Sequence, residues 1–381
     1  MNEKEVAELR RRLRPDKSNI AYIRGCYVNE RKEIISQFNE SLTMMPVEDG
    51  EKYLSFFRKV LTGSIGRNLL DLSFETQQVV SGEEHKLLMT LRDSRLEDEN
   101  AVQMFFSRAI QSLDLEGNSL ILLTYNTYDV YYKGKDDVVQ EDSSSEQFRY
   151  LLCAVCPVKE TKPSLNYINR ESRFHIQAAG QVVGMPELGF MFPAFDDRAT
   201  NIYNALYYNR NIEENHAGFV DTIFKTPVPM PAMVQRETFQ TMLGETLEEE
   251  CSLDVIQSVQ DHLSQMIEVH KESHEVEPLT VSKKGIRAVL AASGVSDERA
   301  EAFDERFDAE FGVNTELNPV NLVDTKRLEV KTPDVVIQVN PERSELVQTR
   351  IINGAKCIVI KVSEGVEVNG VPIQIAEENQ A

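Results

Sequence analysis

The chain has 381 residues, and its 62 acidic and 41 basic side chains give a formal net charge of −21. Hydrophobic residues make up 41% and charged residues 27%, a folding composition that excludes a disordered tail protein and a collagen-like fibre. The length predicts two or three domains. Because the net charge repels polyphosphates, any nucleic-acid contact must come from a local basic patch.

The N-terminal segment and the cysteines indicate the compartment. The first residues are charged where a secretion signal would be apolar, and no apolar run reaches the roughly 20 residues needed to cross a bilayer. The five cysteines are scattered, which fits a reducing cytoplasm better than a disulfide scaffold. They are Cys26, Cys153, Cys156, Cys251 and Cys357. We therefore expect a cytoplasmic protein without membrane contact.

The first half of the chain predicts helices that alternate with antiparallel strands. Apolar residues recur with helical spacing in three segments: 2–13, 48–66 and 83–113. Two strands joined at Asn29-Glu30 follow the first helix. Two further apolar runs, 119–132 and 148–158, flank a polar, acidic loop from Lys133 to Gln147. Such runs predict an antiparallel pair at the centre of a sheet.

The second half predicts a strand over 188–192, a helix from about Asp197, and a hinge in the proline-rich segment 225–233. Near the C-terminus, Asn353-Gly354 between apolar runs is a strong hairpin signal. We expect an α+β fold with an antiparallel sheet and packed helices, a helical connection, and a small C-terminal α+β module. The predicted parts are a basic N-terminal helix (1–19), an N-terminal α+β domain (20–224), a Pro-rich hinge with a helical connection (225–278), and a C-terminal helical module with a β-hairpin (279–375).

Two motifs resemble reactive or metal sites. Cys153 and Cys156 form a Cys-x-x-Cys, but the motif lies in a predicted strand, whose period of two places the side chains on opposite faces. We interpret both as core cysteines. His270 and His274 have helical spacing, and His262 lies on the same side, but a zinc site needs three or four ligands and no Glu follows His270 as in the metalloprotease pattern. We interpret them as part of a solvated helix end.

Asp196 and Asp197 are paired carboxylates, which can hold Mg²⁺ or perform acid–base chemistry. They also stand at the predicted start of a helix, where negative charge is stabilising. We prefer the capping interpretation. The sequence therefore predicts no metal site, no cofactor and no catalytic residue.

One dense group of cations is present in this otherwise acidic chain. It consists of Arg10, Arg11, Arg12, Arg14, Lys17 and Arg24. Two interpretations stay open: a solvated helix whose arginines pair with nearby glutamates, or an arm that contacts phosphates. In the second case these six residues form the nucleic-acid-binding site.

Four segments carry a resemblance over nearly the whole chain: LRRRLRPDKSNI, IRGCYVNE, ELGFMFPAFDDRATNIYNALYY and IINGAKCIVIKVSEGVEVNGVPI. They are similar to a family of clostridial-type bacterial proteins, domain of unknown function 4317. This resemblance implies no activity.

The order of elements carries a second, more distant resemblance over residues 20–362. Helices ending in MFFSRAIQSL lead to the strands SLILLTYNTY and FRYLLCAVCPV, then to FVDTIF, QRETFQTML, the helical VSDERAEAFDERFDAEFG and the hairpin VVIQVNPE with KCIVIKV. This order is similar to that of the 37-kDa nucleoid-associated protein family, whose Gram-negative members lie on the bacterial chromosome. The chain departs from it in segment 1–19, an acidic loop at 135–146 and the tail after 362, so the resemblance defines no DNA-contacting residue.

We expect a non-enzymatic protein at the nucleoid that binds DNA or a chromosome-associated protein. Two other functions stay open: a protein-interaction or regulatory module, such as a defence component, without DNA contact, and a metal-dependent hydrolase that uses Asp196, Asp197 and histidines. Acidity favours the interaction module, whereas the basic segment and the second resemblance favour DNA binding. The 12 tyrosines and 17 phenylalanines, several on apolar helix faces, predict a homodimer.

Overall fold

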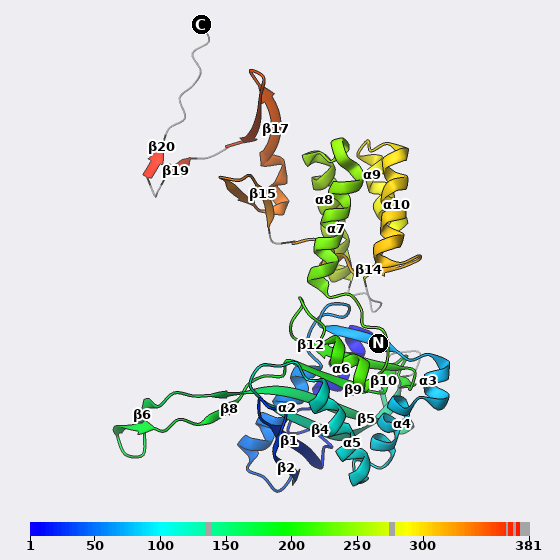
Figure 1. Cartoon of the computed structure of the whole chain (residues 1–381), viewed down its shortest axis with the longest axis vertical. Coiled ribbons are helices and arrows are strands. Elements are labelled where there is room, and N and C mark those ends of the chain that lie inside the picture. Colours follow the sequence, from blue (N-terminus) through cyan, green and yellow to red (C-terminus); the bar gives the residue numbers. More distant parts are fainter. Residues whose placement is uncertain (134–138, 274–278, 326, 363–364, 369–370, 374–381) are drawn as a thin grey trace. The chain divides into compact units, whose positions relative to one another are not determined.

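The computed structural model shows an α+β protein, as the sequence predicts (Figure 1). It describes residues 1–133, 139–273, 279–325, 327–362, 365–368 and 371–373. The chain divides into two compact units, one of Met1–Val234 and one of Gln235–Glu275 with Leu279–Ala381. Each unit has a hydrophobic core of its own.

In the first unit, eight strands within the described residues form one antiparallel sheet. Their order is β2-β1-β4-β5-β9-β12-β3, and β8 pairs with β5. The strands are β1 (Tyr22–Val28), β2 (Ile34–Ser41), β3 (Leu69–Ser73), β4 (Asn118–Lys133), β5 (Val139–Glu160), β8 (Gln181–Val183), β9 (Leu188–Phe192) and β12 (Asn204–Asn209).

The predicted central pair is confirmed, since β4 and β5 lie in the middle of this sheet. The loop predicted from Lys133 to Gln147 is wrong in extent. Strand β5 already begins at Val139, and residues 134–138 lie outside the described part of the chain. The prediction relied on the polar composition of this segment, but the backbone pairing of β4 with β5 continues beyond their apolar residues.

Helices cover both faces of the sheet. Residues Leu120 and Leu122 of β4 belong to the core that the helices α1 and α2 close, whereas Ile121 and Leu123 belong to the core on the opposite face. Burial on both faces explains why the central strands are continuously apolar. The helices are α1 (Glu3–Arg12) and α2 (Val47–Val60) on one face, and α3 (Thr76–Ser81), α4 (Glu83–Asp93), α5 (Glu99–Ser112) and α6 (Ala217–Ile223) on the other.

Two small hairpins complete this unit: β6 (Ser164–Ile168) with β7 (Arg173–Gln177), and β10 (Ala194–Asp196) with β11 (Ala199–Asn201). The second hairpin overturns the helix predicted from about Asp197. Asp197 and Arg198 both have positive φ, 48° and 60°, which is the geometry of a tight two-residue hairpin turn. The carboxylates of Asp196 and Asp197 therefore do not cap a helix.

The second unit packs helices around the side chains of Phe239, Leu243, Leu263, Phe303 and Phe307. Ser282 and Ser296 cap α9 and α10, and the predicted Asn353-Gly354 turn joins β17 to β18. Its elements are α7 (Ala232–Leu247), which begins in the first unit, η1 (Glu248–Glu250), α8 (Leu253–Ser273), β13 (Val281–Ser282), α9 (Lys283–Ala292), α10 (Asp297–Phe311), β14 (Glu316–Leu317), α11 (Pro319–Leu322), β15 (Leu328–Lys331), β16 (Val336–Val339), η2 (Pro341–Leu346), β17 (Val347–Ile352), β18 (Ala355–Ile360), β19 (Val366–Val368) and β20 (Val371–Ile373).

Candidate nucleic-acid interface

Helix α1 carries three of the six predicted cationic residues, all in its last turn. The helix starts with a capping box: the Asn2 side chain accepts a hydrogen bond from the Glu5 backbone at 3.0 Å, and the Glu5 carboxylate accepts one from the Asn2 backbone at 2.9 Å. Val6 and Leu9 are buried against the sheet. Arginines occupy the last turn, where the helix dipole favours positive charge.

Two of the six predicted cations contact an aromatic or acidic side chain within the protein. The Arg12 guanidinium carbon lies 4.9 Å from the ring centroid of Tyr128, close enough for a cation–π contact. Arg24 on β1 donates to the Leu96 carbonyl oxygen at 2.8 Å and forms an ion pair of 2.7 Å with Glu99. Its side chain is only 12% exposed, so Arg24 joins β1 to the turn between α4 and α5.

The other four cations are Arg10, Arg11, Arg14 and Lys17. Arg10 is half-buried and the other three are exposed. Within the described part of the chain, none of the four forms an ion pair. The predicted pairing of neighbouring glutamates with Arg10, Arg11 or Arg14 is therefore not seen among the described residues. Glu5 instead contacts Asn2, and Glu8 pairs with Arg198.

A cavity of about 670 Å³ opens at the end of this basic segment. Asn19, two residues beyond Lys17, lines the cavity, and the turn Arg95–Glu97 closes another side. The cavity lies on the sheet face that α4 and α5 cover, because Tyr125 and Leu96 also contact that core. Its remaining lining residues are Ala21, Tyr22, Arg24, Asn39, Thr127 and Gln147.

The cavity combines flat aromatic rings with neutral polar groups. The side chain of Tyr22 is 59% exposed. The positive charge of Arg24 is balanced by Glu99, and Arg95 shares the lining with Glu97. Aromatic rings with amide and hydroxyl groups suit an uncharged planar ring better than a multiply charged anion.

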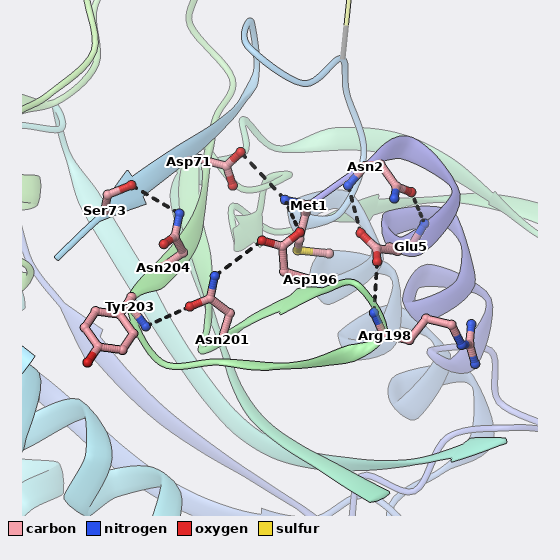
Figure 2. Close-up of polar contacts among 10 residues, drawn as sticks. All are labelled: Met1, Asn2, Glu5, Asp71, Ser73, Asp196, Arg198, Asn201, Tyr203 and Asn204. Carbon is pink, nitrogen blue, oxygen red and sulfur yellow. Dashed lines mark hydrogen bonds and ion pairs between the residues drawn. The ribbon is translucent and has the colours of Figure 1, made fainter. Parts of the chain in front are cut away.

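The carboxylates considered for metal binding lie near the start of α1 (Figure 2). The Met1 ammonium lies 3.2 Å from Asp196 and 3.9 Å from Asp71. The Glu5 carboxylate also accepts a hydrogen bond from the Arg198 backbone at 3.2 Å. Burial raises the pKa of Asp71, with the nearby ammonium acting in the opposite direction. Donors of the chain itself thus already contact Glu5 and Asp196.

Two groups of described residues bring three possible ligand atoms within 4.8 Å of one another: Glu5 with Asp196 and Asp197, and Asp114 with Glu214 and His216. The first group contains no histidine, so the predicted combination with nearby histidines is absent from the described residues. In the second group, His216 Nδ1 lies 2.7 Å from Asp114 Oδ1, so a hydrogen bond between the two side chains explains why they lie close together. His270 lies on α8, and His274 lies outside the described residues.

The Cys-x-x-Cys motif is confirmed as part of the core. Cys153 belongs to the core on one face of the sheet and Cys156 to the core on the other face. Burial raises the pKa of both thiols, which disfavours the reactive thiolate.

The family model described as Domain of unknown function (DUF4317) matches residues 1–371. The chain belongs to this family. The match spans both units and confirms the first resemblance found in the sequence. A search of curated proteins gives no match. None of the helices that the structure describes is long and apolar enough to cross a membrane.

Sequence reasoning found the basic segment but missed the cavity. Its lining comes from separate segments of the chain, so no local motif marks it. One side of the cavity is closed by the turn at Arg95-Leu96, where both residues have positive φ, 56° and 64°. Neither residue type favours that conformation, and the sequence alone therefore gave no reason to expect the turn.

Proposed function

We propose that this chain binds nucleic acid without catalysing a reaction, through Arg10, Arg11, Arg14 and Lys17. One observation carries the proposal. In a chain with 62 acidic residues, these four neighbouring cations form no ion pair within the described residues. Phosphates are the ligands that such a group attracts, and they release counterions on binding.

The binding expected from this surface is weak and largely independent of sequence, because phosphate contacts carry no base information. The acidic remainder of the chain lowers the affinity further, and salt screens this repulsion. These properties fit a protein at the nucleoid that associates with DNA or with a DNA-bound partner. We include homodimer formation in the cytoplasm in this proposal.

The cavity extends the proposal from phosphates to bases. Residues 14–19 lead from the exposed cations to Asn19 in the cavity lining. A single strand whose phosphates follow these cations would bring a base to Tyr22 and Tyr125. Stacking on aromatic rings contributes about 1–3 kcal/mol per base and tolerates any sequence. We therefore expect single-stranded DNA to bind more tightly than duplex of the same length.

The test is a salt titration of binding to random single-stranded and duplex oligonucleotides. With about four phosphates neutralised on duplex, log affinity should fall against log salt with a slope of about −3.6. The double variant Arg11→Ala/Arg14→Ala should reduce the slope to about −1.8. The matched control Arg31→Ala/Lys86→Ala removes two exposed cations elsewhere in the same unit and should leave the slope unchanged.

Equal slopes for the double variant and the wild type would remove α1 from the interface. Absence of binding at low salt would reject the nucleic-acid proposal altogether. Tighter binding to duplex than to single strands would reject the role of the cavity while leaving the phosphate contacts intact.

A protein-interaction module without DNA contact is the second candidate. The observation that favours it is the β6–β7 hairpin, on which Leu165, Phe174 and Ile176 are more than 60% exposed. Exposed apolar clusters of this kind mark protein contacts. A pull-down from cell lysate with and without nuclease separates the two functions, because a direct protein partner stays bound after the nucleic acid is digested.

A further inference from the structure

The β6–β7 hairpin has one apolar face. Leu165 lies opposite Ile176 and Tyr167 lies opposite Phe174 in the antiparallel register. Because directly opposite residues share a face and alternate residues of a strand return to it, all four side chains lie on one side. Their exposed fractions are 64%, 76%, 51% and 62% in that order. The rings of Tyr167 and Phe174 contact each other edge to face, with centroids 5.1 Å apart.

The other face of the hairpin is mainly polar, with Ile168 opposite Arg173 as its apolar member. Asn166 lies opposite His175 there, between the apolar pairs. Glu171, in the connecting turn, forms an ion pair with Arg173 at 2.8 Å, and its carboxylate lies 3.0 Å from His175 Nε2. The hairpin therefore separates apolar from polar side chains as a strand does when one side is buried.

We call residues 161–180 the arm; it continues the ribbon of β5 and β8 and projects from the sheet (Figure 1). The arm starts with the Thr161 backbone N–H donating to the Gly180 carbonyl oxygen at 2.8 Å. An isolated two-stranded hairpin is at best marginally stable in water, and four large apolar side chains add an exposed patch. A second surface must cover this face for the arm to gain stability from it.

We propose that a second copy of this chain covers the apolar face of the arm. Charge supports this partner. The arm holds three cationic side chains and one acidic side chain, a formal charge of +2, whereas the whole chain carries −21. The arm is thus positive and apolar on a strongly acidic protein, and the body of another copy supplies the complementary charge.

The available area also fits. Four side chains of this size, each more than half exposed, offer roughly 500 Å² per arm. With an equal area covered on the partner, and with the same contact repeated about a two-fold axis, the interface would bury about 2,000 Å² in total. Stable specific dimers bury about 1,200–2,000 Å². This inference does not depend on the proposed nucleic-acid binding.

The experiment compares the molar mass of the full-length chain and two variants by light scattering between 1 and about 50 μM. The variant Tyr167→Ser/Phe174→Ser removes two rings from the apolar face. The matched control Asn166→Ser/His175→Ser changes the polar face of the same two strands. We expect wild type and control near twice 43.4 kDa, and the ring variant near 43.4 kDa with dimer affinity reduced roughly 100-fold or more.

Thermal unfolding followed by circular dichroism checks that the variants stay folded, since the arm contributes little to either core. A ring variant that dimerises like the wild type would overturn the proposal. So would a monomeric wild type. If the wild type is monomeric, and the ring variant but not the control binds nucleic acid more weakly than the wild type, then nucleic acid covers the arm and the proposal of a second copy is wrong.

Discussion

Replacing Arg24 by methionine should show that this arginine stabilises the fold and does not contact phosphates. The variant keeps a long apolar stem but removes the guanidinium that contacts Leu96 and Glu99. Losing a charged donor to a backbone carbonyl costs about 1.5–3 kcal/mol. The ion pair adds about 0–1 kcal/mol, because the Glu99 side chain is 63% exposed.

We therefore expect Arg24→Met to lower the free energy of unfolding by about 2–3 kcal/mol. In a unit of this size that corresponds to a fall in melting temperature of about 4–12 °C. Urea unfolding followed by circular dichroism at constant ionic strength measures the change. The matched control Arg31→Met, at an exposed position between β1 and β2, should stay within about 0.5 kcal/mol of the wild type.

The variant Glu99→Gln locates the stabilising contact. It keeps an acceptor for Arg24 and should cost at most about 1 kcal/mol. If Glu99→Gln costs as much as Arg24→Met, the exposed ion pair rather than the Leu96 carbonyl stabilises the turn, and the reasoning is wrong. The salt dependence of nucleic-acid binding should be the same in Arg24→Met and the wild type, in contrast to the Arg11→Ala/Arg14→Ala variant.

Three further predictions follow from burial. A thiol reagent should modify the partly exposed Cys251 and Cys357 in the native protein and the three buried cysteines only after unfolding; native modification of more than two thiols would contradict the core. Because burial raises the pKa of Asp71, folding favours its protonated form, and this stability is lost as pH rises through the raised pKa. Asp71→Asn should therefore melt higher than the wild type at pH 7, with a smaller difference near pH 4. A Cβ at Gly189 would lie 2.4 Å from the Cys153 carbonyl oxygen, so Gly189→Ala should cost about 1–3 kcal/mol in urea unfolding, whereas Gly50→Ala, whose nearest contact is 3.6 Å, should be neutral or stabilising.

The sequence predicted elements well wherever burial dictated the pattern. The apolar stripe of α5 and the continuous apolar runs of β4 and β5 are buried as expected. Local chemistry also predicted the hairpin turn at Asn353-Gly354. In these places short-range preferences and the final packing agree.

The errors arose where a short segment depended on its surroundings. Asp196 and Asp197 looked like a helix start, yet the chain reverses there in a hairpin against the start of α1. The cavity was not predictable, since the cross-strand register brings Arg24 to Asn39 and the fold brings Arg95 to Tyr125. Spacing along the chain contains no information about such contacts.

The capped helix α1 has a consequence for the energetics of binding. Val6, Leu9 and Leu13 are part of the core that α1 closes, so the cations near its end are held on a rigid support rather than on a loose tail. A ligand at these cations would not need to order the segment and would bind with a smaller entropic penalty. Binding in turn stabilises the fold. Unfolding of the first unit would separate the cations, so a saturating polyanion should raise the melting temperature of that unit.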